Sequence, residues 1–87
     1  MPTPEEVVEW LLEAYQGLVD RYRKCMNSRD RDKCVRTVYN QLLLLCRDYR
    51  SLLQIAESYS TLGMTLVNNI TLLAREVASA VREEEPC

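Results

Sequence analysis

The chain has 87 residues, of which 28% are charged and 47% are hydrophobic, and its formal net charge is −2. Histidine is absent, which removes the side chain most often used for acid–base catalysis near neutral pH and for binding zinc or copper. Two glycines and three prolines are few, and this scarcity favours helices over sheets. We therefore expect one all-α domain over residues 1–87 that is not an enzyme, with no catalytic residue, metal or cofactor.

The first predicted helix runs from about residue 4 to about residue 26. Thr3 can cap it, Pro4 is tolerated at its first position, and Glu6 can complete a capping box. Its apolar residues then repeat at spacings of three and four, which is typical of a helix that packs one side against a neighbour. Asn27–Asp30 has the side chains of a short turn, so the next helix should run antiparallel to the first.

An unbroken heptad pattern predicts a single long central helix over about residues 31–60. Its apolar positions are Val35, Val38, Leu42, Leu45, Tyr49, Leu52, Ala56 and Tyr59. At about 1.5 Å per residue, such a helix would be roughly 45 Å long. The rings of Tyr49 and Tyr59 fall on this stripe, and we expect them in the core.

Gly63 lies where the heptad pattern stops, and it predicts a left-handed residue just after the helix ends. Thr65 can then cap a third helix that continues to about residue 84, and Pro86 would end it. The predicted fold is an antiparallel three-helix bundle with a long central helix, in which two copies could join into a larger bundle.

Several apolar residues lie off these core stripes when each residue turns the helix by 100°. The candidate interface consists of Trp10, Leu43, Leu44, Ile55 and Leu72. On the first helix, Ala14 and Gly17 lie in line with Trp10, and small residues let a second backbone approach closely. A wide monomer core is the alternative, because isolated exposed apolar residues are ordinary. We expect a homodimer or contact with a protein partner.

Seven of the eleven cations lie within residues 21–36, and arginines outnumber lysines nine to two, as in thermophilic or GC-rich sources. The candidate basic patch is Arg29, Arg31, Lys33 and Arg36. One interpretation pairs it with the acidic residues 83–85, which the antiparallel topology brings near. The other is a phosphate-binding surface for nucleic acid, which is the second functional hypothesis. Interspersed aspartates favour charge pairing.

Four cysteines are present. Cys25 and Cys34 lie almost symmetrically about the predicted turn, and they are a candidate disulfide if their Cα atoms approach within about 7 Å. In a reducing cytosol the same pair would stay as thiols. We expect Cys46 to be a buried small hydrophobe and Cys87 to be mobile and able to link chains. Without a long apolar span or a secretory pattern, we expect a cytoplasmic protein without membrane contact.

Residues Cys46–Tyr49, Ile55–Ser58, Gly63 and Leu73–Val77 form a helical pattern over roughly half the chain. This pattern resembles the skeleton of cysteine-rich helical bundle proteins that store copper. The resemblance implies metal ligands that are cysteines recurring down the bundle core. Only Cys46 fits, because the other corresponding positions hold Tyr49, Leu53, Thr71, Ala74, Ala78 and Val81. Copper storage is therefore not expected here.

Overall fold

Helix α1 begins with the capping box that its sequence predicts. In the computed structural model, which describes residues 2–87, α1 spans Pro4–Cys25. The Thr3 hydroxyl oxygen accepts a hydrogen bond from the Glu6 backbone N–H at 3.2 Å, and the Glu6 carboxylate accepts one from the Thr3 backbone N–H at 3.2 Å. Two otherwise unpaired N–H groups are thereby satisfied, which fixes where the helix starts.

The prediction of one long central helix is wrong. The segment is divided into α2, Arg31–Asp48, and α3, Arg50–Tyr59, with Tyr49 between them at φ −109° and ψ 25°. No proline or glycine lies in this stretch, so local helix propensity does not cause the break. Beyond the break, α3 packs on α4 (Thr61–Val81) and α1.

The break also turns the buried face of the chain. Leu53 and Ala56 are buried in α3, whereas Tyr49 and Tyr59 are 40% and 45% exposed. The expectation that these two tyrosines fill the core is therefore wrong. A heptad stripe stays on one side only while the helix is continuous, and here it is not.

Helix α4 spans Thr61–Val81 and starts four residues earlier than predicted. Its cap is Ser60 rather than Thr65, because the Ser60 hydroxyl oxygen accepts a hydrogen bond from the Gly63 backbone N–H at 3.0 Å. Gly63 therefore lies inside the helix and is not left-handed. The left-handed residue is Arg82, at φ 58° and ψ 46°, which ends α4 before Pro86 is reached.

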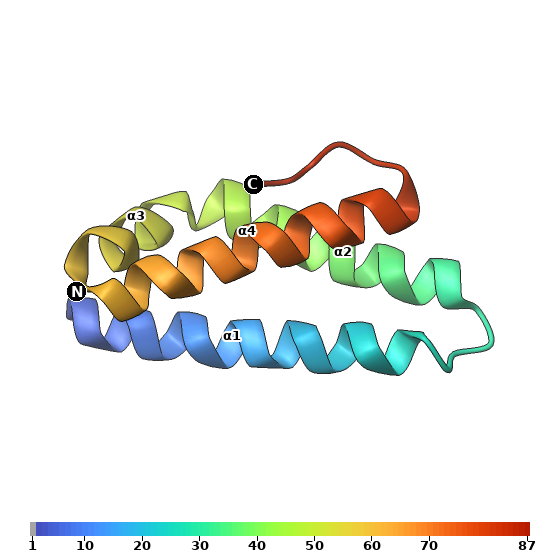
Figure 1. The fold of residues 1–87 in the computed structure, drawn as a ribbon, viewed down its shortest axis with the longest axis horizontal. Coiled ribbons are helices and arrows are strands. Elements are labelled where there is room, and N and C mark those ends of the chain that lie inside the picture. The colour runs from blue at the N-terminus through green and yellow to red at the C-terminus, as the bar shows by residue number, and fades with distance from the viewer. Residues whose placement is uncertain (1) are drawn as a thin grey trace.

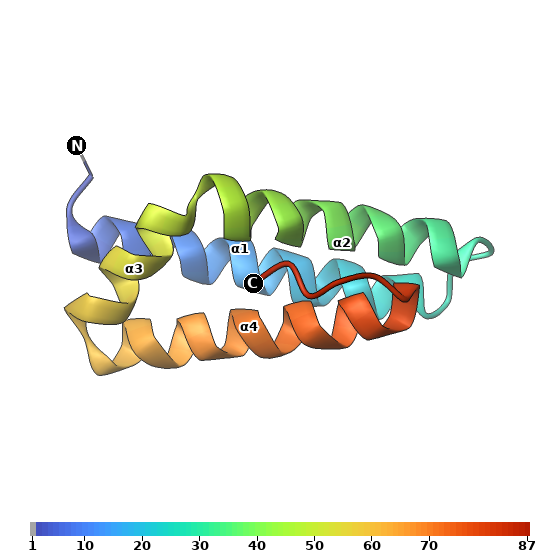
Figure 2. The same cartoon turned by 90° about the horizontal axis from the view of Figure 1, so that it is seen from above.

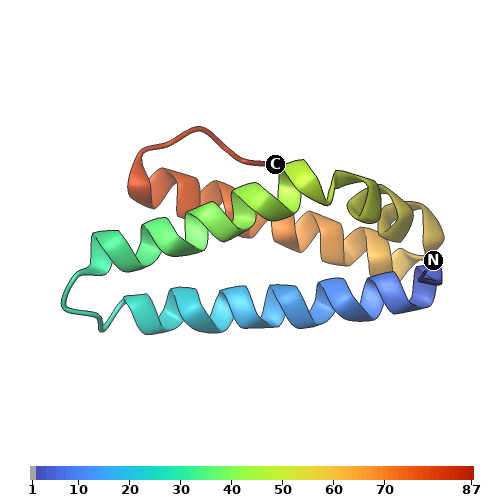
Figure 3. The ribbon, with the colours of Figure 1, turned by 180° about the vertical axis from the view of Figure 1, so that it is seen from behind.

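The three long helices lie side by side, with α1 and α4 running in one direction and α2 running in the other (Figures 1 and 2). Helix α3 covers the end of the bundle next to the N-terminus. The core is filled from all of them, and its largest fully buried side chains are Leu11, Val38, Leu42, Ile70 and Val77. After α4 the chain is extended and turns back along the bundle (Figure 3). None of the four helices combines the length and hydropathy needed to cross a bilayer.

Candidate functional site

The candidate site is a surface groove between α1 and α2. We call it the α1–α2 groove, and its volume is about 400 Å³. It is lined by Trp10, Glu13, Ala14, Gly17, Leu18, Arg21, Gln41, Leu44, Leu45 and Tyr49. These residues come from one side of α1, from the carboxyl-terminal half of α2 and from Tyr49 just after it, so the groove follows the α1–α2 hairpin lengthwise.

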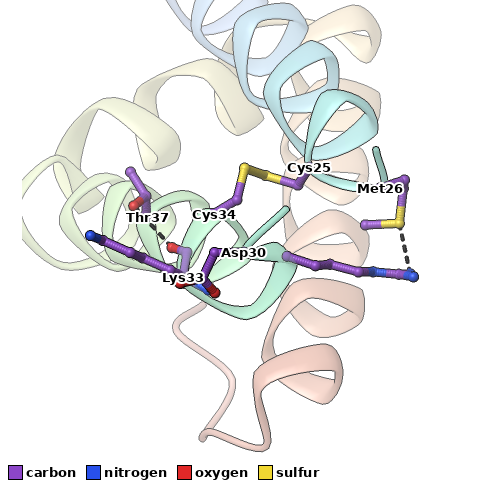
Figure 4. The surroundings of a disulfide bond; sticks show 7 residues. Cys25, Met26, Asp30, Lys33, Cys34 and Thr37 are labelled. Carbon is purple, nitrogen blue, oxygen red and sulfur yellow. Dashed lines mark hydrogen bonds between the residues drawn. A yellow bond between two sulfur atoms is a disulfide. The ribbon is translucent and has the colours of Figure 1, made fainter. Parts of the chain in front are cut away.

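A cysteine pair at one end and an aromatic pair at the other hold this hairpin in register. Beside the turn, Cys25 and Cys34 lie at disulfide distance with their Cα atoms 5.4 Å apart, and Figure 4 shows the sulfur bridge between the two helices. At the other end, the rings of Trp10 and Tyr49 pack with centroids 5.3 Å apart and planes tilted by 53°. Between these two points residues of α1 and α2 face each other in antiparallel order, which places Gln41 near the level of Gly17.

Gly17 lies in the groove and is exposed, although it is inside a helix. A Cβ built on Gly17 would meet nothing within 4 Å. Glycine in a helix interior costs about 0.5–1 kcal/mol relative to alanine. Nothing packed against α1 within the described chain requires this residue, so its cost is not explained by the fold.

Gln41 is the polar residue on the α2 side of the groove. Its Oε1 atom is buried and accepts no hydrogen bond from any described residue. Burying an acceptor without a donor costs roughly 1–3 kcal/mol, and such an atom needs an explanation.

The candidate interface residues do not form one surface. Trp10 and Leu44 are 43% and 51% exposed and both line the α1–α2 groove. Leu72 is 57% exposed but lies in another groove, between α1 and α4. Leu43 is half-buried and Ile55 is exposed on α3, and neither lines the α1–α2 groove.

Tyr49 and Gln41 belong to this site but are not among its predicted residues. The heptad pattern assigned Tyr49 to the core, which hid its pairing with Trp10. A signal existed, however: if Cys25 faces Cys34 in an antiparallel hairpin, then the residue fifteen before Cys25 faces the residue fifteen after Cys34. Those residues are Trp10 and Tyr49.

Charge along the groove is divided between its two halves. Glu13 lines the half nearer the N-terminus and Arg21 lines the half nearer the turn. Among residues 2–87, neither forms an ion pair. Beyond Trp10 and Tyr49 the surface continues past Glu6 and Glu9, so this end is acidic.

The basic patch is paired with the acidic tail at one position. Arg36 contacts Asp32 at 2.9 Å and Glu83 at 3.4 Å, and it also donates a hydrogen bond to the carbonyl oxygen of Val81 at 3.3 Å. The hydrogen bond to Asp32 raises the pKa of Arg36, and Glu83 adds to this effect.

The other patch residues, Arg29, Arg31 and Lys33, are exposed. Arg31 donates to the sulfur of Met26 at 2.8 Å, and the Lys33 side chain points away from the disulfide in Figure 4.

Of the remaining two cysteines, Cys46 is buried as expected, whereas Cys87 differs from expectation. Cys87 is not a mobile thiol but lies at disulfide distance from Cys46, with their Cα atoms 5.1 Å apart. The carboxyl-terminal tail is thus tied to the end of α2. Within the described part of the chain, no group of three or more His, Cys, Asp or Glu residues is placed to hold a metal ion.

Comparison with known proteins adds no relative to this description. No protein-family model, no curated protein and no solved structure matches the chain.

Proposed function

We propose that this chain is a non-enzymatic interaction protein whose α1–α2 groove binds an apolar helical surface of another protein chain. The observation that carries the proposal is the space over Gly17, walled by the exposed side chains of Trp10, Leu44 and Tyr49. Exposed aromatic and leucine side chains around a space that admits a backbone are typical of helix-in-groove recognition.

A dye-binding experiment tests the groove without any knowledge of the partner. Trp10 is the only tryptophan and it lines the groove, so energy transfer from it to an apolar dye such as anilinonaphthalene sulfonate reports dye bound to the molecule, and two variants locate the site. We expect Leu44→Glu to abolish the transfer, because it places a charge on the groove wall.

Leu72→Glu is the matched control, because Leu72 is similarly exposed but lies between α1 and α4. This variant should bind the dye as the parent does. Equal transfer in both variants, or loss only in Leu72→Glu, would contradict the proposal.

We also propose that the protein works in an oxidising compartment rather than in the cytoplasm. Both cysteine pairs have Cα separations compatible with disulfides, 5.4 Å and 5.1 Å. Structural disulfides persist mainly outside reducing compartments. Alkylation of thiols in protein from its natural source, with no reductant added, should label no cysteine.

Nucleic-acid binding by Arg29, Arg31, Lys33 and Arg36 is the less favoured function. The contacts of Arg36 with Asp32 and Glu83 occupy one of the four cations. Salt-dependent retention on a nucleic-acid column, lost when all four residues are neutralised, would support it.

A further inference from the structure

We infer that the occupant of the α1–α2 groove is a second copy of this chain, packed antiparallel with the twofold axis beside Gly17. This inference rests on the proposed function of the groove and names its partner. A twofold interface uses the same surface on both subunits, so that surface must be complementary to itself. The α1 side of the groove has this property.

Charge complementarity is the first argument. Glu13 precedes Gly17 by four residues and Arg21 follows it by four, and both line the groove. In an antiparallel pair of α1 helices that cross at Gly17, Glu13 therefore faces Arg21 of the partner subunit, and the twofold axis generates the same pair again. Within one chain the two side chains are eight residues, or about 12 Å, apart along the helix and cannot pair.

Trp10 is placed by the same twofold axis. Trp10 precedes Gly17 by seven residues and Lys24 follows it by seven, so all three lie on one side of α1. The antiparallel pair brings the exposed ring of Trp10 to Lys24 of the partner subunit. A cation over an indole face is a favourable contact.

The second argument is the backbone. A Cβ at Gly17 would meet nothing in the monomer, whereas two helices that cross at a pair of glycines approach closely. Gln41 lies near the same level across the groove, and the axis brings it near Gln41 of the partner subunit.

The available surface is large enough for such a dimer. A specific interface of ordinary size takes about 800 Å² from each partner. The accessible surface of this chain is 5984 Å², and the groove side extends along a bundle that is 40 Å long and 22 Å wide. One side of the α1–α2 hairpin can therefore supply the area.

Charge reversal tests the arrangement, with the dimer dissociation constant measured by light scattering and sedimentation. Glu13→Arg and Arg21→Glu should each weaken the dimer about tenfold or more, because each creates two like-charge contacts across the axis. The Glu13→Arg/Arg21→Glu double variant should recover to within about threefold of the parent. A mixture of the two single variants should form heterodimers, seen by native mass spectrometry, because both of its cross-axis pairs are again opposite in charge.

Arg23→Glu is the matched control: it carries the same charge change but lies in the α1–α4 groove. It should leave the dimer unchanged, and helical circular dichroism should show that every variant is folded. Unchanged dimerisation in both single variants, or no recovery in the double variant and the mixture, overturns the antiparallel arrangement. If the parent protein is monomeric at about 1 mM, the occupant of the α1–α2 groove is not a second copy of this chain. In either case the dye experiment with Leu44→Glu still decides whether the groove binds apolar ligands.

Discussion

Gly63 in the first turn of α4 lies against the main-chain carbonyl group of Ala56 in α3, so closely that a Cβ at position 63 would overlap the carbonyl oxygen. Both residues are buried, and the two helices are joined by Ser60 alone. The absence of a side chain therefore permits the sharp return of the chain from α3 into α4. The molecule has one other glycine, Gly17, where the opposite holds and a Cβ meets open space.

The two glycines should respond in opposite ways to alanine. Gly63→Ala should lower the free energy of unfolding by about 1–3 kcal/mol, because the added methyl group must push α3 and α4 apart. Gly17→Ala should raise the free energy of unfolding of the monomer by about 0.5–1 kcal/mol, because alanine has the higher helix propensity. Urea unfolding followed by circular dichroism at low protein concentration measures both. A gain of stability in Gly63→Ala would show that the α3–α4 contact is not as described, and a loss in Gly17→Ala would contradict the open space at Gly17.

Much of this fold could be predicted from the sequence, where local chemistry decided the outcome. The capping box of Thr3 and Glu6 starts α1, and the residues of Asn27–Asp30 form the turn. The division of the central helix could not be predicted, because residues 31–60 contain neither glycine nor proline and keep a regular heptad. After the break at Tyr49, α3 packs on α4, and no pattern within α2 records that contact.

The site could be predicted in part. Helical phase alone separated Trp10 and Leu44 from the core, and both line the groove. Phase could not show that Leu72 lies between different helices, since that depends on how α4 is placed around α1. The cost of Gly17 becomes apparent only when its surroundings are known to be open.

The cysteine pair beside the turn should contribute strongly to stability. Cys25 and Cys34 are separated by nine positions in the sequence, and closing this short loop restricts the unfolded chain. In the chain-entropy model such a cross-link contributes about 2.5–3 kcal/mol. We expect the Cys25→Ala/Cys34→Ala variant to lose about that amount in thermal or urea unfolding. The parent should label with a thiol reagent only after reduction, and labelling without reductant would contradict the pairing.

The position of the carboxyl-terminal tail, residues 83–87, should depend on Cys87 more than the stability of the helical bundle does. Three side-chain contacts besides the Cys46–Cys87 pair hold the tail: Arg36 with Glu83 at 3.4 Å, Arg75 with Glu85 at 3.2 Å, and the Tyr39 hydroxyl donating to the Glu84 carbonyl oxygen at 2.8 Å. The charged contacts are exposed and contribute little alone.

Cys87→Ala should therefore speed amide hydrogen exchange at Glu83, whose N–H donates to the Ala78 carbonyl oxygen at 3.0 Å, and leave the exchange of α1 almost unchanged. Cys25→Ala/Cys34→Ala is the comparison, because it should affect the hairpin and not the tail. Unchanged exchange at Glu83 in Cys87→Ala would show that the polar contacts suffice to hold the start of the tail.

Stability should fall at alkaline pH, in part through Tyr59. Its hydroxyl donates a hydrogen bond to the Glu5 carboxylate at 2.9 Å and so connects α3 to the start of α1. That hydrogen bond raises the pKa of Tyr59, and desolvation and the charge of Glu5 act in the same direction. Burial, followed by the charge of Glu76, likewise raises the pKa of Tyr22, although Arg31 lowers it.

The sign of the pH dependence follows from these shifts. Because the folded protein holds the phenolic proton more tightly than the unfolded chain, the contribution is fully present below about pH 10, the pKa of an unfolded tyrosine. It is lost as the pH rises through the higher folded value. Unfolding by urea at a series of alkaline pH values should therefore show a decline that is shallower in Tyr59→Phe.

Glu5→Gln separates the hydrogen bond from a general alkaline effect. It keeps the Tyr59 hydroxyl but removes the carboxylate that disfavours its ionisation, so the pKa of Tyr59 should move back toward the ordinary value. Tyrosinate absorbance should then show one tyrosine titrating at lower pH than in the parent, and Tyr59→Phe should lack that tyrosine altogether. If Glu5→Gln and the parent titrate alike, the link between α3 and the start of α1 does not depend on this pair.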